Sequence, residues 1–546
     1  MDYNKLAELL FPDIDKTPEY WEEKFPMRDL PEGAKVTRIG PSPTGFIHLG
    51  NLYNALIGER LAHQSNGVFF LRIEDTDNKR EVQGAVETVL QAMEFFGVHF
   101  DEGAVVDGDN GAYGPYRQRQ RKEIYQTMAK HLVRQGKAYP CFCSEDELAA
   151  MREKQQAAKE NFGYWGAYAK CRDLTYEQIE DNLKKGKPFV LRYRSEGTGE
   201  KNIRVFDAIR GELEMQENYQ DLVLLKSDGI PTYHFAHVVD DHLMRTTHVV
   251  RGEEWLATLP MHVQLFDIMG WKRPIFCHTA VLEKIDGEQR RKLSKRKDPE
   301  LALAFYQAEG YLPRAVWEYL LTVLNSNYEE WRIANPNADC REFEFTAEKM
   351  SNSGTLFDLD KLNDISKEVI ASMSAAEIYE QLLVWAKAYQ PDFAVLLERD
   401  RAYAERIIDI GRNGDRPRKD MLTWGQAVRF LSFYFDETYK REDEYPANVT
   451  NEMRNEIISA YLETLDFGDD GSAWFAKVKD IAAAKGFALK PKDYKKHPED
   501  YPGSIVDVSN VIRVAITGRQ NSPDLWEISQ AIGEDRIRAR VSAEIS

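Results

Sequence analysis

The sequence predicts an α/β half that extends to about residue 300 and an all-α half that follows it. Two apolar runs of strand length, 36–39 and 67–73, flank a loop and a helical pattern at 51–66, which is the β-loop-α-β order of an open parallel sheet. Beyond residue 300 the apolar residues recur at helical spacing, and no strand-rich stretch of comparable length follows. At 546 residues, the chain is long enough for about three or more domains.

The loop between the first strand and its helix, residues 38–51, has the composition of an anion site. Its two prolines fix φ and end the strand, and Gly45 permits a sharp turn before the helical pattern that starts after His48. A helix that starts there points unpaired backbone N–H groups and the positive end of its dipole at whatever lies above the loop. The segment therefore predicts a phosphate site, and the alternative is an ordinary turn between a strand and a helix.

The remaining elements of the α/β half follow in order. The acidic cluster 74–77 ends the second strand, and ligands of parallel sheets bind beyond the carboxyl ends of the strands, so we expect this cluster to share a crevice with residues 38–44. Between 139 and 225 a Cys-Phe-Cys run, charged helices and short strands predict an insertion into the sheet domain. The expected elements are one or two short amphipathic helices in 1–34, helices at 81–97, 117–136, 144–160, 175–185 and 260–269, and strands at 189–193, 202–207, 233–239, 247–251 and 274–282.

A cluster of positive charge precedes the helical half. Residues 290–297 read Arg-Arg-Lys-Leu-Ser-Lys-Arg-Lys, and helices are expected beyond them at 301–309, 313–325, 360–373 and 375–389. A phosphate-cradling loop with His48 and Gly50, together with a distant loop that carries Lys292 and Lys295, predicts stabilisation of charge on a triphosphate during displacement at its α-phosphorus. Such a reaction needs no covalent nucleophile from the protein.

The composition of the chain indicates its cellular compartment and limits the kinds of partner that it can bind. The formal net charge of −18 argues against a generally basic nucleic-acid-binding protein, but two stretches, 117–137 and 477–496, are locally basic. Each is either a nucleic-acid surface or a solvated helix face. No run of 18 apolar residues and no signal peptide are present, and the five cysteines fit a reducing compartment, so we expect a cytoplasmic protein with no membrane span.

Two short motifs resemble the signatures of class I aminoacyl-tRNA synthetases. His48-Leu-Gly50-Asn51 resembles their His-Ile-Gly-His motif, and Lys292-Leu-Ser-Lys295-Arg296 resembles their Lys-Met-Ser-Lys-Ser loop. Longer segments resemble the glutamyl-tRNA synthetases of the bacterial type, and the likeness covers nearly everything after residue 35. These segments are 38–45, 71–77, 114–121, 229–236, 238–244, 250–255 and 513–519.

The resemblance implies a reaction and an architecture. L-Glutamate would be activated by ATP, with Mg²⁺, to a glutamyl-adenylate and transferred to the terminal adenosine of tRNA(Glu), with release of AMP and pyrophosphate by a monomer. The implied fold is a Rossmann-like α/β catalytic domain with an α+β acceptor-binding insertion, followed by all-α stem-contact and anticodon-binding domains. The expected boundaries are 1–34 for an N-terminal helical extension, 35–138 and 229–300 for the catalytic domain, 139–228 for the insertion, 301–374 for the stem-contact domain and 375–546 for the anticodon-binding domain.

The resemblance also assigns residues. A carboxylate is read best by guanidinium forks, and glutamine would leave such a buried arginine poorly paired, so the physics agrees with a glutamate site. For each arginine the alternative is a structural ion pair. The catalytic residues would be His48, Gly50, Lys292 and Lys295; ATP would lie against Thr44, His48, Gly50, Asn51 and Lys295; and glutamate would lie against Arg38, Ser42, Glu74, Tyr233 and Arg251.

A group of cysteines resembles the zinc knob of some family members. Three thiolates from Cys141, Cys143 and Cys171, completed by Asp173 or Tyr168, match the ligand number of a tetrahedral site. The alternative is a packed cluster of cysteines that holds no metal. For the C-terminal half, Arg416, Arg418, Lys419 and the basic stretch 477–496 are candidates for contact with the anticodon, and Trp424, Phe430, Phe433 and Tyr434 are expected in the core.

Some positions depart from the family pattern. Asn51 stands where glycine is common, and His237 stands where asparagine often lines the amino-acid pocket. Glutaminyl-tRNA synthetase is a close alternative, but Pro41-Ser-Pro-Thr-Gly45 differs from its usual Pro-Glu-Pro-Asn-Gly. A truncated paralogue would lack the anticodon half, and the intact His48 and Lys295 argue against a catalytically idle paralogue.

Overall fold

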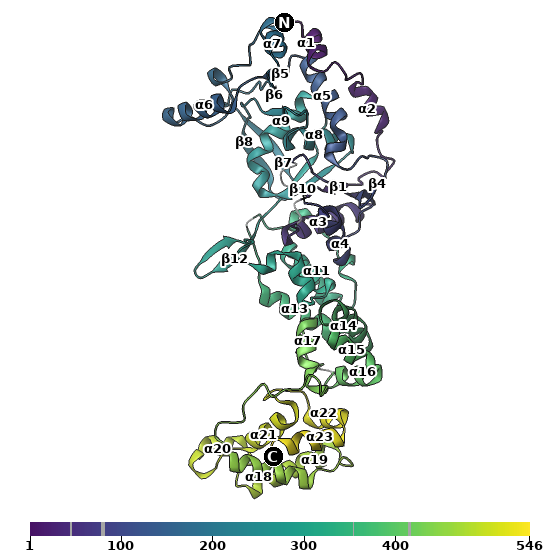
Figure 1. Ribbon diagram of the computed structural model, residues 1–546, viewed down its shortest axis with the longest axis vertical. Helices are drawn as coiled ribbons and strands as arrows, with labels where there is room; N and C mark the ends of the chain where they lie inside the picture. Colours follow the sequence, from purple (N-terminus) through teal and green to yellow (C-terminus); the bar gives the residue numbers. More distant parts are fainter. Residues whose placement is uncertain (44–45, 78–81, 353, 413–416, 546) are drawn as a thin grey trace. The chain divides into compact units, whose positions relative to one another are not determined.

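The computed structural model describes residues 1–43, 46–77, 82–352, 354–412 and 417–545. The chain forms two compact units, coloured along the sequence in Figure 1. Unit 1 comprises Met1–Phe305 and Trp317–Asp358, and unit 2 comprises Tyr306–Val316 and Leu359–Ser546. The division into an α/β part and a helical part confirms the predicted fold class, whereas the bounds of the six predicted segments stay a prediction.

Unit 1 is built on two four-stranded sheets. In the first, β1, β2 and β3 run parallel and β4 closes the edge antiparallel; in the second, β10, β11 and β7 run parallel and β8 closes the edge antiparallel. The N–H of Thr247 donates to the carbonyl of Val36 at 2.9 Å, which joins the chain before β10 to the start of β1. The strands are β1 (Val36–Ile39), β2 (Val68–Leu71), β3 (Glu102–Val105), β4 (Gly108–Asn110), β7 (Asn202–Asp207), β8 (Gly211–Gln216), β10 (His248–Gly252) and β11 (Ile275–Thr279).

Helices accompany these strands in the expected βα order. The helix after β1 buries Leu52, Ala55 and Leu56, and the β2 side chains Phe69, Phe70 and Leu71 are completely buried, which forms the core of the unit. The helices are α1 (Tyr3–Leu10), α2 (Pro18–Lys24), α3 (Leu49–His63), α4 (Ala85–Phe95), α5 (Lys122–Arg134), α8 (Tyr233–Leu243), α9 (Leu259–Ile268) and α12 (Tyr328–Ala334). The helix α10 (Leu303–Glu309) spans the sequence boundary between the two units, which lies after Phe305.

The N-terminal segment forms the two predicted short helices and packs on α5. Its buried side chains include Leu6, Trp21 and Phe25, and the indole N–H of Trp21 donates to Thr127 Oγ1 at 3.2 Å. Arg28 reaches further and makes a two-pronged ion pair with Glu102 of β3, at 2.8 and 3.0 Å. The segment is therefore an integral part of unit 1.

The predicted insertion forms a small sheet of its own. Its three strands, β5 (Ala138–Cys141), β6 (Val190–Tyr193) and β9 (Val223–Leu225), pair antiparallel, and its helices are α6 (Glu145–Ala158) and α7 (Tyr176–Lys184). The strand expected at 202–207 does not join this small sheet. It is β7, and its Asp207 pairs with Phe276 of β11 in the larger sheet.

The strand expected at 233–239 is wrong, because these residues begin α8. A short, continuous apolar run does not distinguish a buried strand from a buried helix, and Phe235, Ala236, Val238 and Val239 are all completely buried. The expected strand 274–282 is divided, since β11 ends at Thr279 and a hairpin starts at Leu282. That hairpin pairs β12 (Leu282–Asp286) with β13 (Gln289–Lys292) and adds β14 (Thr355–Leu356) to its edge.

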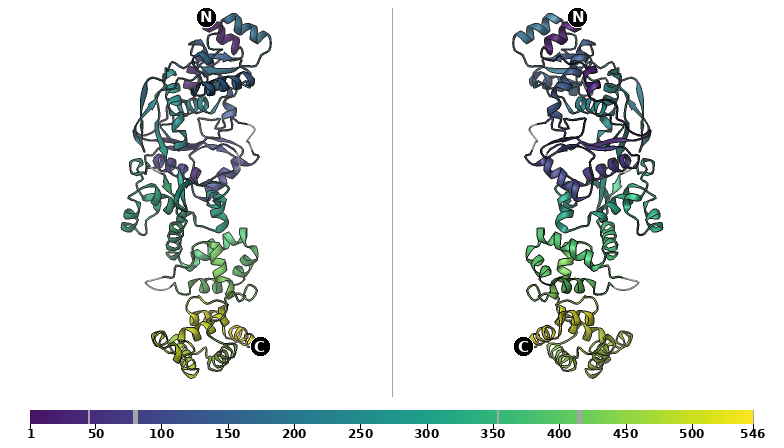
Figure 2. Two further views of the ribbon diagram at one scale, coloured as in Figure 1. Left: turned by 90° about the vertical axis from the view of Figure 1, so that its left-hand side faces the viewer. Right: turned by 90° about the vertical axis from the view of Figure 1, so that its right-hand side faces the viewer.

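Unit 2 is helical, as Figure 2 shows for its green and yellow segments, and its described residues contain no strand. The predicted core residues Trp424, Phe433 and Tyr434 are buried in one continuous apolar cluster. The helices beyond α10 are α11 (Pro313–Leu324), which spans the sequence boundary of the two units, α13 (Leu359–Ala371), α14 (Ala375–Tyr389), α15 (Pro391–Arg399), α16 (Arg401–Asp409), α17 (Trp424–Leu431), α18 (Asn451–Thr464), α19 (Gly471–Ala484), α20 (Pro491–Lys496), α21 (Ile505–Thr517), α22 (Leu525–Ile532) and α23 (Glu534–Ala543). Among the residues that the structure describes, no helix is both long and apolar enough to cross a membrane.

Candidate active site

One cavity of about 350 Å³ lies in unit 1 at the carboxyl ends of β1 and β10 and the N-termini of α3 and α8. This is the position at which open parallel sheets bind ligands. All five residues assigned to glutamate and two of those assigned to ATP line the cavity. They are Arg38, Ser42, His48, Asn51, Glu74, Tyr233 and Arg251.

His48 connects this cavity to both lysines of the basic loop. It also lines a second cavity of about 300 Å³ together with Lys295, and a third of about 80 Å³ together with Gly50 and Lys292. The two motifs, which are far apart in the sequence, therefore line neighbouring cavities that share His48. Thr44, the remaining residue assigned to ATP, lies outside the described residues.

The N-terminus of α3 holds His48 in place. The N–H of His48 donates to Asn51 Oδ1 at 3.0 Å, and the imidazole Nδ1 is buried with no hydrogen-bond partner. Burial, followed by the charges of Lys295 and Lys292, lowers the pKa of His48, so the ring is neutral at neutral pH. A methyl group on Gly50 would lie 3.0 Å from the His48 ring, so the ring would have to shift by a few tenths of an ångström to make room for it.

An aspartate shapes the loop that carries the two lysines. Asp298 is buried and accepts two hydrogen bonds from the Arg291 guanidinium, at 2.6 and 2.8 Å, and one from the N–H of Ser294 at 2.8 Å. The Arg291 hydrogen bond is the largest of the effects that lower the pKa of Asp298. Lys292 and Lys295 remain exposed, and Lys295 Nζ lies 3.6 Å from the centroid of the Phe46 ring. The loop therefore presents two ammonium groups to the cavities that His48 lines, and neither makes an ion pair with a residue that the structure describes.

Arg38 and Glu74 belong to a buried ion network. Arg38 donates to both oxygens of Asp241, at 3.1 and 3.3 Å, and Arg72 donates to Asp241 at 2.6 Å and to Glu74 at 3.0 Å. Burial raises the pKa of Glu74, and the charges of Arg72 and Arg38 oppose this effect. Arg38 therefore makes a buried ion pair and also lines the cavity, so its assignment to glutamate stays a prediction.

Arg72 and Asp241 were not assigned from the sequence, although both lie in segments that carry the resemblance. The signal that was available is their charge inside apolar segments, since a charged residue is almost never buried unless it is paired. The structure also adds Glu254 and Trp255 to the lining of the cavity. Trp255 packs on Tyr233, with 4.2 Å between the ring centroids.

Arg251 differs from Arg38 in its partners. It is 5% exposed, and its Nε and Nη1 face histidine rings, whereas Nη2 has no hydrogen-bond partner. Among the described residues Arg251 makes no ion pair with a carboxylate. A buried guanidinium with a free nitrogen that lines a cavity is suited to bind an anion there.

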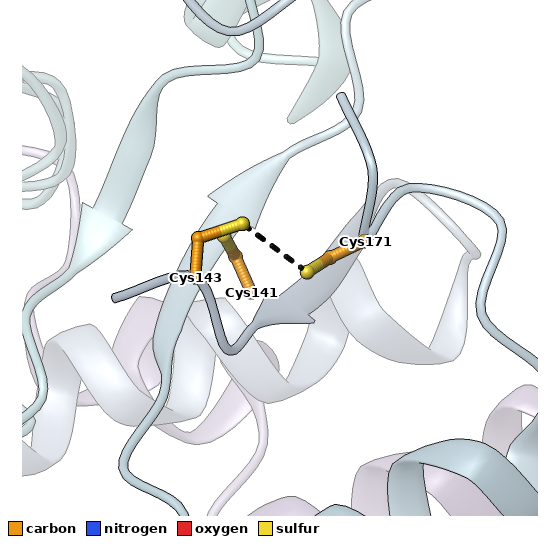
Figure 3. A group of neighbouring side chains, drawn as sticks. All are labelled: Cys141, Cys143 and Cys171. Atoms are coloured by element: carbon orange, nitrogen blue, oxygen red, sulfur yellow. Dashed lines mark hydrogen bonds between the residues drawn. The ribbon is translucent and has the colours of Figure 1, made fainter. Parts of the chain in front are cut away.

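The three cysteines of the insertion come together, as Figure 3 shows, with the sulfurs of Cys143 and Cys171 3.6 Å apart. This separation is close to the edge of about 3.8 Å of a tetrahedron with Zn–S bonds of about 2.3 Å. Asp173 does not join the group, because it is exposed and pairs with Arg194 at 3.0 Å, and the Tyr168 hydroxyl donates to Glu160. The oxygen beside the sulfurs belongs to Tyr164, whose hydroxyl lies 3.3 Å from Cys143 Sγ.

The first basic stretch is largely engaged within the protein. Arg121 is buried and donates to Asp240 at 2.6 Å, Lys130 is buried against Glu8 and two carbonyls, and Arg134 also pairs with Glu8. In the second stretch Lys477 pairs with Asp469, and other lysines stay exposed. These exposed lysines are Lys479, Lys490, Lys492, Lys495 and Lys496. Only the second stretch keeps the features of a surface for nucleic acid.

Comparisons with known proteins agree along the whole chain. Residues 35–364 match the family described as tRNA synthetases class I (E and Q), catalytic domain, and residues 503–545 match an anticodon binding domain. The glutamate–tRNA ligase of Acetivibrio thermocellus is 58% identical over 542 residues and 99% of both chains, and that of Clostridium perfringens strain 13 is 47% identical over 548 residues, 99% of this chain and 100% of the relative.

A solved structure is also similar. The crystal structure of a glutamate tRNA ligase from Elizabethkingia meningosepticum in complex with its amino acid has a TM-score of 0.73 at 27% sequence identity and covers 94% of this chain and 99% of its own. The family match over more than half of the chain and the identity of the relatives lead to one assignment. The chain belongs to the glutamyl-tRNA synthetase family of class I aminoacyl-tRNA synthetases.

Proposed function

We propose that this chain attaches L-glutamate to tRNA(Glu) in two steps. The glutamate α-carboxylate attacks the α-phosphorus of ATP, which enters with Mg²⁺, and pyrophosphate leaves; the terminal adenosine of the tRNA then displaces AMP from the glutamyl-adenylate. The observation that carries this proposal is that His48 lines both the 350 Å³ cavity and the two neighbouring cavities that Lys295 and Lys292 line. An amino acid in the first cavity would lie beside a triphosphate in the others.

Arg251 reads the side-chain carboxylate of glutamate in this proposal. Its unpartnered Nη2 supports the assignment, because a buried N–H of a cation without an acceptor is costly until a ligand supplies one. Arg38 and Tyr233 complete the binding surface, Ser42 lines its open side, and Glu74 suits the substrate ammonium group. Glutamine offers no charge to Arg251 and is rejected for that reason.

The proposed binding of the ATP phosphates depends on positive charge and on the N-terminus of a helix. The N-terminus of α3 supplies backbone N–H groups to the phosphates beside Thr44, Gly50 and Asn51, and neutral His48 donates a hydrogen bond without repelling the lysines. Lys292 and Lys295 neutralise the charge that develops on the leaving pyrophosphate. None of these residues forms a covalent bond to substrate.

Aminoacylation of purified tRNA(Glu) with labelled glutamate and labelled glutamine tests the function. We expect attachment of glutamate with stoichiometric release of AMP and pyrophosphate, and no comparable attachment of glutamine. Pyrophosphate exchange with and without tRNA shows whether activation of glutamate depends on the tRNA. Attachment of glutamine in preference to glutamate would refute the assignment of the pocket.

We also propose that Cys141, Cys143 and Cys171 hold a structural zinc ion, with the Tyr164 hydroxyl rather than Asp173 beside the fourth position. The mutual approach of the three sulfurs and their chemistry support this site. When bound, the metal would cross-link the strand end at Cys141 to the loop at Cys171. Elemental analysis of the purified protein is expected to give one zinc per chain, lost in a Cys143→Ser variant; metal-free protein would favour the packed cysteine cluster.

The tRNA contacts belong to the same proposal. The insertion would hold the acceptor end, and unit 2 would meet the anticodon, with the exposed lysines of 477–496 as candidates. Arg418 stacks on Phe430, at 4.3 Å from the ring centroid, and Lys419 pairs with Glu368, so both are partly engaged within unit 2; Arg416 lies outside the described residues. The bounds of the six predicted segments, the monomeric state and the cytoplasmic location stay predictions.

A further inference from the structure

Three histidine rings from three different elements surround the guanidinium of Arg251. His278 of β11 meets Nε at 2.9 Å, His262 of α9 meets Nη1 at 3.0 Å, and His237 of α8 approaches Nη1 at 3.5 Å. No carboxylate among the described residues touches Arg251. Burial lowers the pKa of Arg251, and the Tyr233 hydroxyl is also near enough to raise it. A buried arginine without a carboxylate partner is unusual, because buried charges are normally paired with an opposite charge.

The hydrogen bonds indicate the tautomer of each ring. In His237, Nδ1 also lies 3.3 Å from Arg38 Nη2, but its shorter contact of 2.7 Å with Asp241 assigns the proton to Nδ1. Arginine only donates, so the nitrogen that faces Arg251 must be the acceptor, and the other nitrogen must carry the proton. The second nitrogens of His278 and His237 lie 2.7 Å from carboxylate oxygens of Asp207 and Asp241, and that of His262 lies 2.9 Å from Nδ1 of His234. Each outer partner accepts the proton that the tautomer requires.

All three rings are therefore neutral. A protonated ring would have no acceptor for Arg251 and would place a second positive charge against it. Burial lowers the pKa of all three imidazoles, and the charge of Arg251 lowers it further. Asp207 and Asp241, the carboxylates of this network, are each one ring removed from the guanidinium.

We infer that His237, His262 and His278 are specificity-determining positioning residues, which hold Arg251 with neutral acceptors and so leave its positive charge uncompensated for the substrate. This inference rests on the proposed role of Arg251 as reader of the glutamate carboxylate. A carboxylate in place of any of these rings would position the guanidinium equally well. It would also satisfy the charge, and an anionic substrate would then have to compete with it.

A comparison of Arg38 with Arg251 supports the role of the histidines. Arg38 lines the same cavity, but Asp241 binds it with both oxygens, so its charge is already compensated. Among the described residues, Arg251 has one nitrogen, Nη2, without a hydrogen-bond partner and makes no ion pair with a carboxylate. Discrimination between a carboxylate and a carboxamide requires an uncompensated charge, since the two groups have nearly the same shape.

A matched pair of substitutions at His262 tests the inference. Asparagine and aspartate have the same shape, and both place an oxygen near the position of Nδ1; they differ in one charge. We expect His262→Asp to raise the KM for glutamate at least 10-fold above that of His262→Asn and to lower the glutamate-to-glutamine ratio of kcat/KM by a similar factor, with the KM for ATP alike in both variants. The same pair at the exposed His99 of unit 1 is the control for added charge, and its two variants should be alike.

Thermal unfolding of the ligand-free proteins gives an independent readout. His262→Asp is expected to unfold at a temperature equal to or above that of His262→Asn, because the new carboxylate pairs with Arg251. Equal KM values for glutamate in the two variants, or failure of His262→Asp alone to fold, would overturn the inference. Failure of the proposed function is distinguishable, since the unmodified enzyme would then not attach glutamate to tRNA.

Discussion

Substitution of Arg251 by glutamine removes the charge that we assign to recognition of glutamate and keeps a polar side chain of similar length. In the folded protein Arg251 Nη2 has no partner, so its N–H groups are available to the substrate carboxylate. One hydrogen bond to a charged group contributes about 1.5–3 kcal/mol. At about 1.4 kcal/mol per tenfold change, the loss of one such bond corresponds to about a 10- to 150-fold fall in kcat/KM for glutamate.

The effect on glutamine should be much smaller. The carboxamide that Arg251→Gln introduces can pair with the carboxamide of a glutamine substrate, whereas glutamate would meet a neutral group in a buried site. Steady-state aminoacylation with each amino acid, at saturating ATP and tRNA, measures the two values of kcat/KM. We expect their ratio to fall by about the factor that glutamate loses.

The same substitution tests whether Arg251 serves stability instead. Burial lowers the pKa of Arg251, which means that the folded protein disfavours its charge. Removal of this charge should offset the lost hydrogen bonds to His262 and His278, so the free energy of unfolding should change little. Unaltered selectivity, combined with a loss of several kcal/mol in unfolding, would identify Arg251 as a structural residue and refute its role in recognition.

Three further predictions concern substitutions of Lys295, Gly50 and His237. Lys295→Ala should lower the rate of adenylate formation by about 10²-fold or more at saturating substrates, because it removes a cation from the leaving pyrophosphate, and an unchanged rate in pyrophosphate exchange would exclude this lysine from the mechanism. Gly50→Ala should raise the KM for ATP, since its methyl group would lie 3.0 Å from the His48 ring; a normal KM would mean that the ring moves aside at no cost. Burial lowers the pKa of His237 to about 3, whereas the pKa of an unfolded histidine is about 6.5. The unfolded state therefore binds a proton at a higher pH than the folded state does. The free energy of unfolding should fall for this reason as the pH decreases from about 6.5 toward 3. As the pH falls from about 6.5 to about 5, this effect should lower the free energy of unfolding by about 2 kcal/mol. The free energy of unfolding of His237→Asn, measured by chemical denaturation, should therefore depend less on pH. The same pH dependence in both proteins would contradict the lowered pKa of His237.

Local sequence was sufficient for the elements that depend on local chemistry. The prolines and glycines of residues 38–51 predicted a loop between a strand and a helix, and β1 and α3 flank it as expected. The order of strands and helices predicted a parallel sheet, and β1–β2 and β10–β11 pair in that way. The motif residues predicted a site at the carboxyl ends of these strands.

Other features depended on neighbours that no local pattern specifies. The run that begins at Tyr233 suits a buried strand and a buried helix equally, and only its packing makes it α8. Asp173 follows Cys171 closely in the sequence, but it pairs with Arg194, and Tyr164 brings its oxygen to the sulfurs instead. Proximity along the chain was a poor guide to the position of these side chains.

The sequence by itself determined which chemical groups this protein brings to its reaction: a phosphate-binding helix start, two lysines and a set of arginines. Only the tertiary structure decided which arginine is neutralised and which keeps its charge. Arg38 meets a carboxylate of α8, whereas Arg251 meets imidazoles from α8, α9 and β11. The physical reason is that a residue's type sets the charge it can carry, whereas burial and the sum of distant partners set how much of that charge remains for a ligand.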